Sequence, residues 1–280
     1  MPKIGAHVSA AVSLELSFER AQNIGAECTQ IFISPPQQWA QPPHSEKEIN
    51  LYHEQSDKTN IMPNFIHAAY LINLASPNPD LVKKSTDWLI YSQKIAEELR
   101  SGGTILHIGS FKDSDFETSL NQVIKSLSLI LTATSNINLI LENSAGAGNL
   151  IGDKFAEIGQ IIKTVNDPRL KVCLDTQHAF ASGYDLRTKN GLEQTVEEFD
   201  REVELNRLVA IHANDSKTDL GSNRDRHENI GEGFIGIDGF KNIVNHKAFQ
   251  NTPFILEVPG FLGTGPDEKN IKLLKSLLNP

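Results

Sequence analysis

Eight short β-type runs alternate with longer amphipathic stretches along the 280 residues of the chain, and this alternation predicts an α/β fold. Eight strand–helix units in a chain of this length favour a closed (β/α)₈ TIM barrel, for which about 250 residues is typical. A doubly wound open sheet is the alternative, but it would place a glycine-rich turn after its first strand. The stretch HVSAAVSLEL, which follows the first run, contains no glycine. We therefore predict a single barrel domain over residues 1–280.

The expected strands are short apolar runs, and the expected helices are amphipathic segments between them. In chain order the strands are KIGAHV (3–8), CTQIFI (28–33), NFIHA (64–68), TILHIG (104–109), NLILEN (138–143), KVCLD (171–175), LVAIHA (208–213) and PFILEV (253–258). The clearest helical segments are residues 81–100, 116–134, 155–165, 192–205 and 267–278. A barrel brings the carboxyl ends of all its strands to one mouth, so polar residues at those ends should form one site.

The composition limits the class of protein. There are 26 Lys and Arg against 35 Asp and Glu, and this net charge of −9 argues against a generic nucleic-acid binder. Cys28 and Cys173 lie inside apolar runs, as is typical of buried thiols in a reducing compartment. The start of the chain carries no secretory signal, and no apolar run approaches the roughly 20 residues of a membrane helix. We therefore expect a cytoplasmic protein.

Titratable side chains stand at the ends of most expected strands. They are His7, His67, His107, Glu142, Asp175, His212 and Glu257, with His178 just beyond the sixth strand and Asp225 and His227 in the RDRHE loop after the seventh. A lone histidine or glutamate in such a place is often a structural residue held by hydrogen bonds. The whole set at one mouth would cost on the order of several kcal/mol for each buried group without compensation, and divalent cations supply that compensation. The other histidines, His44, His53 and His246, are expected at the surface.

The types of candidate ligand indicate the metal. Imidazole and carboxylate without thiolate fit Zn²⁺, with Mn²⁺ or Fe²⁺ as alternatives. The candidates are too many for one tetrahedral ion and suit two or three. Ions about 3.5–4 Å apart are the arrangement that enzymes use for in-line displacement at phosphorus.

Several long motifs match one known family. The strongest is HANDSKTDLGSNRDRHENIGEG (212–233), and YLINLA (70–75), LENSAG (141–146) and LDTQHAFASGYDLRT (174–188) are also specific. The match runs from IGAHVSA near the start to ILEV near the end. On these motifs the chain resembles the endonuclease IV family, the zinc-dependent apurinic/apyrimidinic (AP) endonucleases.

The resemblance implies three zinc ions per chain, with manganese or iron as alternatives at some positions. One ion would be held by His67, His107 and Glu142, a second by Glu142, Asp175, His212 and Glu257, and a third by His178, Asp225 and His227. His7 would lie near the cluster without being a ligand. We interpret Glu142 or Glu257 as the catalytic carboxylate that orients the attacking water or takes its proton.

The implied reaction is hydrolysis of the phosphodiester on the 5′ side of an abasic site in double-stranded DNA, which leaves a 3′-hydroxyl and a 5′-deoxyribose phosphate. The family also removes blocking groups from 3′ ends. A metal ion lowers the pKa of bound water, so a trinuclear zinc-hydroxide mechanism is chemically reasonable. Tyr70 and Leu71 match the pair that the family inserts into the duplex when it flips the abasic nucleotide. We expect a monomer without a membrane partner.

Four departures from the family pattern affect the expected DNA contacts and leave the ligands intact. They are Gln37 in place of an arginine that wedges the DNA, Val12–Ser13 in place of a Gly-Gly pair, Gln177 in place of a cysteine, and HIGSF (107–111) without the usual proline. Glutamine cannot act as a cation, and the loss of glycine removes a close backbone approach to phosphate. A local positive surface for DNA is expected from loop residues on the active face, namely Lys217, Arg224, Arg226, Arg187 and Lys189.

Two other functions fit part of the sequence. A metal-dependent sugar isomerase or epimerase of the same barrel class would need one or two ions, so His178, Asp225 and His227 would have no obvious role. A non-catalytic lesion-binding protein would keep Tyr70 and Leu71 but would have little reason to keep the full set of ligands.

The stretch KVCLDTQHAF (171–180) leads to a more specific prediction. Side chains alternate faces along a straight strand, so Asp175 and His178 cannot both point into the mouth unless the chain turns between them. We predict that turn at Thr176–Gln177. We also predict that Asp175 and His178 serve two different ions of one cluster.

Overall fold

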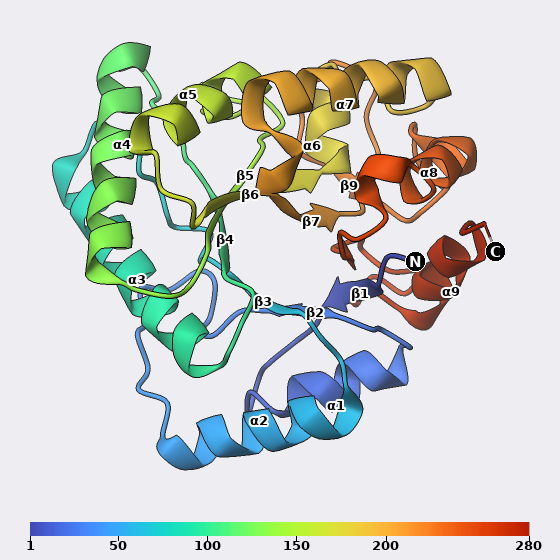
Figure 1. The fold of residues 1–280 in the computed structure, drawn as a ribbon, viewed down its shortest axis with the longest axis horizontal. Helices are drawn as coiled ribbons and strands as arrows, with labels where there is room; N and C mark the ends of the chain where they lie inside the picture. Colours follow the sequence, from blue (N-terminus) through green and yellow to red (C-terminus); the bar gives the residue numbers. More distant parts are fainter. Residues whose placement is uncertain (280) are drawn as a thin grey trace.

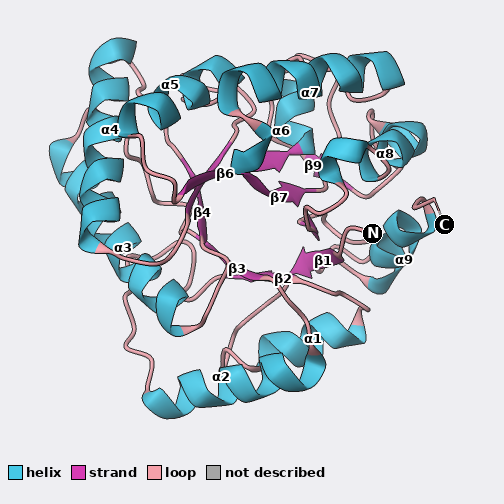
Figure 2. Cartoon of the chain, in the orientation of Figure 1, coloured by secondary structure: helices cyan, strands magenta, loops and turns pink. Residues whose placement is uncertain are grey.

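Eight parallel strands close into a barrel in the computed structural model, which describes residues 1–279 (Figure 1). Around the barrel the order is β1, β10, β7, β6, β5, β4, β3 and β2, and β2 pairs with β1 again. Each of these neighbouring pairs is parallel. Figure 2 shows the helices as an outer ring around the strands. The predicted (β/α)₈ barrel is therefore confirmed.

The barrel strands lie within or close to the predicted runs. They are β1 (Ile4–His7), β2 (Thr29–Ile31), β3 (Asn64–His67), β4 (Thr104–His107), β5 (Leu139–Glu142), β6 (Leu170–Asp175), β7 (Leu208–His212) and β10 (Phe254–Leu256). Most predicted runs extend a few residues further because apolar residues continue into the loops at the mouth.

The main helices follow the strands in turn. They are α1 (Leu16–Asn23), α2 (Glu46–Thr59), α3 (Pro79–Glu98), α4 (Phe116–Ala133), α5 (Phe155–Val165), α6 (Thr176–Ala181), α7 (Lys189–Val203), α8 (Gly236–Val244) and α9 (Glu268–Ser276). Helix α3 begins earlier than predicted because Asn78 accepts a hydrogen bond from the backbone N–H of Asp80 and Pro79 suits the first helical position. Among the described residues, no helix combines the length and the apolar character that a membrane crossing requires.

Four short elements lie in the loops and were not predicted. They are the 3₁₀ turns η1 (Leu205–Arg207) and η2 (Lys247–Phe249) and the strands β8 (Asp215–Ser216) and β9 (His227–Glu228). Strands β8 and β9 pair antiparallel and form a small hairpin above β7. Two residues are too few to show a strand period, so the sequence pattern carries no signal for them.

The barrel interior consists of an apolar layer below a polar layer. The apolar layer is formed by Cys28, Phe65, Ile105, Ile140, Cys173, Ala210 and Ile255. Side chains two residues further along a strand face the same interior. Those positions are His7, Gln30, His67, His107, Glu142, Asp175, His212 and Glu257. The polar layer therefore lies at the carboxyl ends of the strands, directly above a packed apolar floor.

Candidate metal centre

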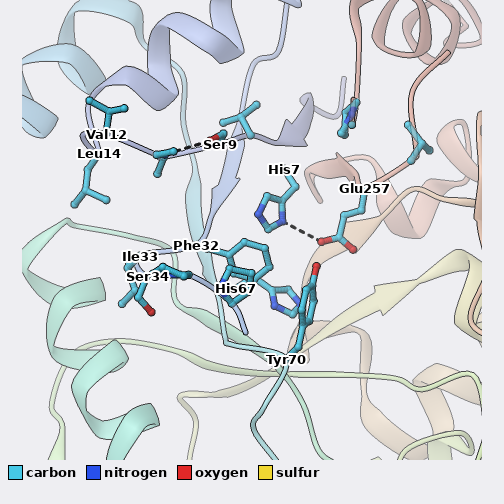
Figure 3. Close-up of a pocket in the computed structure, with 18 of the residues that line it drawn as sticks. His7, Ser9, Val12, Leu14, Phe32, Ile33, Ser34, His67, Tyr70 and Glu257 are labelled. Atoms are coloured by element: carbon cyan, nitrogen blue, oxygen red, sulfur yellow. Dashed lines mark hydrogen bonds and ion pairs between the residues drawn. The ribbon is translucent and has the colours of Figure 1, made fainter. Parts of the chain in front are cut away.

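A cavity of about 1070 Å³ opens at the carboxyl ends of the strands. One end of it is walled by the imidazole and carboxylate side chains of the polar layer and the other by the loops after β1 and β2. Figure 3 shows His7, His67, Tyr70 and Glu257 around the first end, with Val12 at the other. The cavity is therefore the place where a substrate would meet the titratable cluster.

Three groups of ligand-type side chains lie at the floor of the cavity and directly beneath it. They are His67, His107 and Glu142; then Glu142, Asp175, His212 and Glu257; and then Asp175, His178 and His227, with the ligand atoms of each group within 4.8 Å of one another. Asp225 adjoins the third group, because its carboxylate oxygens lie 3.4 Å from Nε2 of His178 and 3.4 Å from Nε2 of His227. The structure thus brings all nine predicted ligands together.

Glu142 lies at the centre of the cluster and belongs to two of the groups. Its Oε2 lies 3.2 Å from Nε2 of His67 and 3.5 Å from Nε2 of His107, and its Oε1 lies 2.9 Å from Nδ1 of His212. Burial opposes ionisation of this carboxyl, but the histidines around it hold its pKa well below the ordinary value. The carboxylate is therefore charged at neutral pH and is positioned between two groups.

Asp175 also belongs to two groups, and how many ions it serves stays a prediction. Its Oδ2 lies 3.8 Å from Nδ1 of His212 and 3.8 Å from Nε2 of His227. The predicted turn after Asp175 is present as helix α6. Oδ1 of Asp175 accepts a hydrogen bond of 2.8 Å from the backbone N–H of His178 and caps this helix. The capped turn carries the His178 ring to the mouth.

Three histidines are held in the orientation that metal ligands need. Nδ1 lies 2.8 Å from the Ala68 carbonyl in His67, 2.9 Å from the Asn143 carbonyl in His178 and 3.3 Å from the Glu257 carbonyl in His227. A carbonyl can only accept, so each Nδ1 carries a proton and each Nε2 is the nitrogen left to bind a metal in the cluster. Nε2 of His178 and of His227 is buried without a hydrogen-bond partner in the described part of the chain. A divalent cation would satisfy these nitrogens, so the residues present fit a metal.

The electrostatics of the cluster also favour cations. Burial disfavours a charged His178, but the carboxylates of Asp175, Asp225 and Glu142 raise its pKa well above the ordinary value. The pKa of Asp225 falls to about 2, because the histidines around it outweigh its partial burial. In the absence of metal, protons on the imidazoles therefore balance the carboxylates, and metal ions would displace them.

Gln30 lies inside this site and was not among the predicted residues. It is fully buried on β2 and contacts His7, His212 and Glu257 through its side-chain amide. A period-two pattern could have found it, because Gln30 follows the buried Cys28 by two residues, as His107 follows Ile105. Gln30 was not predicted because it lies within the predicted strand (28–33), away from its carboxyl end, and its side chain carries no charge. His44 was also missed, since it was expected at the surface but lines the cavity wall.

The residues predicted to contact DNA differ in whether they line the cavity. Tyr70 lines it and is 60% exposed, and its ring packs against Phe32 with the ring centroids 5.3 Å apart. The backbone N–H of Tyr70 donates to the carbonyl of Pro36 over 2.9 Å, so the loop before exposed Gln37 adjoins Tyr70. Leu71 is half-buried, and neither it nor Gln37 is among the residues that line the cavity.

The remaining departures and basic residues have separate positions. Gln177 is buried and donates to the Arg224 carbonyl over 2.9 Å, so it braces the loop that carries Asp225. Lys217, Arg224 and Arg226 are exposed in the β8–β9 hairpin, whereas Arg187 pairs with Asp185 over 2.8 Å. The prediction that Lys189 belongs to a loop of the active face is wrong, because it begins helix α7 and lines a different hollow.

Comparison with known proteins identifies the family. A family model described as "Xylose isomerase-like TIM barrel" matches residues 18–277. A "Probable endonuclease 4" of Halothermothrix orenii is 40% identical over 275 residues, which cover 98% of this chain and 99% of that protein. The crystal structure of endonuclease IV from Thermus thermophilus matches with a TM-score of 0.87 and 29% identity, covering 99% of this chain and 98% of that one. A D-tagatose 3-epimerase-like protein has a TM-score of 0.75 at 22% identity and shares only the fold. The chain therefore belongs to the endonuclease IV family.

Proposed function

We propose that this protein is an AP endonuclease of DNA repair, which hydrolyses the phosphodiester on the 5′ side of an abasic site and leaves a 3′-hydroxyl and a 5′-deoxyribose phosphate. The observation that carries the proposal is the third ligand group, with Asp225 adjoining it 3.4 Å from both His178 and His227, beside the other two groups. A sugar isomerase with one or two ions would have no use for this group. The names of the full-length relatives support the same class of enzyme.

We propose Zn²⁺ as the cofactor, with three ions per chain. The first would be held by His67, His107 and Glu142, the second by Glu142, Asp175, His212 and Glu257, and the third by His178, Asp225 and His227, next to Asp175. When bound, such ions lower the pKa of water and polarise a phosphate for in-line attack. Manganese or iron at individual positions is compatible with the same ligands.

The two glutamates of the cluster differ in their access to substrate. Glu257 lines the cavity and its side chain is 17% exposed, whereas the side chain of Glu142 is inaccessible. Burial opposes ionisation of Glu257, but His212 and His7 lower its pKa below the ordinary value, so it remains a charged acceptor. We assign Glu257 to orienting the attacking water through hydrogen bonds and Glu142 to joining two ligand groups.

Substrate selection would depend on the rim of the cavity. An abasic nucleotide has no base to unstack, so it leaves the duplex at the lowest cost. Exposed Tyr70 stands beside the cavity that would receive this nucleotide, and Leu71 and Gln37 lie on the adjoining loops. Lys217, Arg224 and Arg226, which are exposed on the β8–β9 hairpin, would contact phosphates. The open mouth would also admit a blocked 3′ end.

The test uses a duplex with one abasic analogue and a matched undamaged duplex. Zinc-loaded protein should cut the first on the 5′ side of the lesion and leave the second intact, and prolonged chelation should abolish cutting. Absence of cutting by loaded protein would overturn the proposed activity. Unchanged cutting by fully stripped protein would overturn the metal mechanism. A metal content near one ion per chain would favour a sugar isomerase.

The role of Tyr70 is tested separately. Tyr70→Ala removes an exposed ring that makes no side-chain hydrogen bond within the described residues, so folding and zinc content should be unchanged. Binding to abasic DNA should weaken by roughly 10-fold or more, since a stacking aromatic contributes about 1–3 kcal/mol. Equal affinity of the variant and the wild type would exclude insertion of Tyr70. We also propose that the enzyme is a monomer and that it acts in the cytoplasm; the free thiols of Cys28 and Cys173 support the proposed compartment.

A further inference from the structure

Gln30 contacts three other side chains of the polar layer. Its Nε2 lies 2.6 Å from Oε1 of Glu257 and 2.9 Å from Nδ1 of His7, and its Oε1 lies 2.8 Å from Nε2 of His212. The side chain is fully buried, so water does not compete for these contacts. One neutral amide therefore connects a carboxylate and two imidazoles.

The contact with Glu257 fixes which way the amide faces. A carboxylate oxygen only accepts hydrogen bonds, so the group 2.6 Å from it is the amide nitrogen and not the amide oxygen. The amide oxygen consequently faces His212, and Nε2 of His212 must carry a proton to donate to it. Nδ1 of His212 is then the ring nitrogen left to bind a metal, and it lies 2.9 Å from Glu142 Oε1 and 3.2 Å from Glu257 Oε2.

His212 thus uses the opposite ring nitrogen from its neighbours. In His67, His178 and His227 a backbone carbonyl holds the proton on Nδ1 and leaves Nε2 for the cluster. In His212 the amide oxygen of Gln30 takes the place of that carbonyl and leaves Nδ1 for the cluster. The tautomer of this histidine therefore depends on a side chain, which a mutation can change.

The same amide determines the tautomer of His7. An amide nitrogen only donates, so the Nδ1 of His7 that lies 2.9 Å from it must be an acceptor without a proton. His7 Nδ1 therefore does not donate a hydrogen bond to Glu257 Oε1, although these atoms are 3.2 Å apart. The proton of a neutral His7 is then on Nε2, which has no hydrogen-bond partner among residues 1–279, and the ring lines the cavity.

We propose that Gln30 is a positioning residue that sets two histidine tautomers at once. It presents His212 to the cluster through Nδ1, and it presents His7 to the cavity as a hydrogen-bond donor through Nε2. The atom that would accept from His7 is a phosphate oxygen of the substrate, and this last assignment alone rests on the proposed function. Amide side chains in such positions orient ligands and tune their affinity for metal.

The decisive measurement is the protonation state of each ring nitrogen by ¹H–¹⁵N NMR of histidine-labelled, zinc-loaded protein without DNA. His7→Asn and His212→Asn assign the signals. In the wild type, His7 and His212 should both be protonated on Nε2 only. Gln30→Glu replaces the donor to His7 with an acceptor, so His7 should move its proton to Nδ1 while His212 stays unchanged. A wild-type His7 protonated on Nδ1, or a Gln30→Glu variant with unchanged His7, would overturn the proposal.

Zinc affinity provides a second readout. Gln30→Met keeps the volume but removes all three hydrogen bonds of the amide. Competition with a chelator should then show an affinity for one ion that is weaker by about 10- to 100-fold, as is typical when a side chain that orients a metal ligand is lost. Gln93→Met is the matched control, because Gln93 is a buried glutamine that bonds the Asn138 carbonyl on the helix side of the barrel. It should leave zinc affinity unchanged. Equal affinities in the two variants would contradict the role of Gln30. Neither measurement uses DNA, so its failure is distinct from a failure to cut abasic sites.

Discussion

Val12 has a backbone conformation that β-branched residues rarely adopt. Its φ is 80°, in the left-handed region, and its β-branched side chain is 94% exposed. This conformation costs about 1–2 kcal/mol for an L-residue. The loop is held in place by Arg20, which donates to the carbonyls of Ser9 over 2.6 Å and Ala11 over 3.0 Å. The strain is therefore maintained by contacts of the residues just before Val12.

Val12→Gly should raise the free energy of unfolding by up to about 1 kcal/mol, because relief of strain exceeds the added chain entropy of glycine. Urea denaturation of metal-loaded protein measures the change. Ala11→Gly is the control, since the φ of Ala11 is not positive and glycine there should destabilise slightly. A Val12→Gly variant no more stable than Ala11→Gly would show that the loop carries no strain.

The shared ligands predict different metal losses for different single substitutions. Asp175 belongs to two ligand groups and His67 to one. His67→Asn should therefore lower the metal content by one ion, and Asp175→Asn should lower it by up to two. Elemental analysis after gel filtration measures the metal content. His53→Asn is the control, because His53 bonds the Glu98 carbonyl at an exposed position outside the ligand groups. Equal losses in His67→Asn and Asp175→Asn would argue against a shared Asp175.

At the scale of elements, the loop between β7 and α8 is organised by one buried carboxylate. Asp215 accepts hydrogen bonds from the backbone N–H groups of Gly231, Gly233 and Ile235 at 2.9, 3.1 and 2.9 Å. It also begins β8, whose pairing places His227 opposite Ser216. The geometry of the third ligand group therefore depends on a residue that is not a ligand.

Asp215→Asn should destabilise the protein by about 3 kcal/mol, since hydrogen bonds to a charged acceptor are strong and the amide would turn a donor toward N–H groups. Denaturant unfolding of the stripped protein measures the loss. Asp238→Asn makes the same chemical change at an exposed position of α8 and should alter stability by less than about 0.5 kcal/mol. If the two variants unfold alike, Asp215 does not organise the loop.

At the scale of the whole molecule, the cluster makes stability depend on pH in opposite ways with and without metal. Nearby carboxylates overcome burial and raise the pKa of His178 and of His212 well above the ordinary value. A histidine with a raised pKa stabilises the folded state below about pH 6.5 and loses this contribution as the pH rises through its folded pKa. Burial lowers the pKa of His7 and His107, which acts in the opposite direction, but these shifts are smaller.

The melting temperature of stripped protein should therefore fall as the pH rises from about 6 to about 9. That of zinc-loaded protein should instead fall toward acid pH, because the ligands bind metal only when deprotonated. Calorimetry across this range measures both curves. His178→Gln should flatten the curve of the stripped protein. Parallel curves for the stripped and loaded proteins would contradict a proton-filled metal site.

Much of the site was accessible from the sequence because barrel geometry relates strand ends to one another. His107, Glu142 and His212 each end an apolar run, and parallel strands bring such ends together. Gln30 was missed because an uncharged side chain within a strand gives no sign of its partners. Strands β8 and β9 were not predicted because they are too short for a periodic pattern, and helix α6 was predicted only as a turn after Asp175.

The sequence by itself determined the barrel, because strand and helix periodicities are local properties of the chain. Its motifs identified the family, and the residues at its strand ends identified the set that meets at the mouth. Only the tertiary structure decided which atoms face one another. It placed Asp175 in a second ligand group, and it set the opposite tautomer of His212 through Gln30. Which atoms form hydrogen bonds depends on differences of a few tenths of an ångström in the distances between residues that are far apart in the chain, and no sequence spacing encodes such differences.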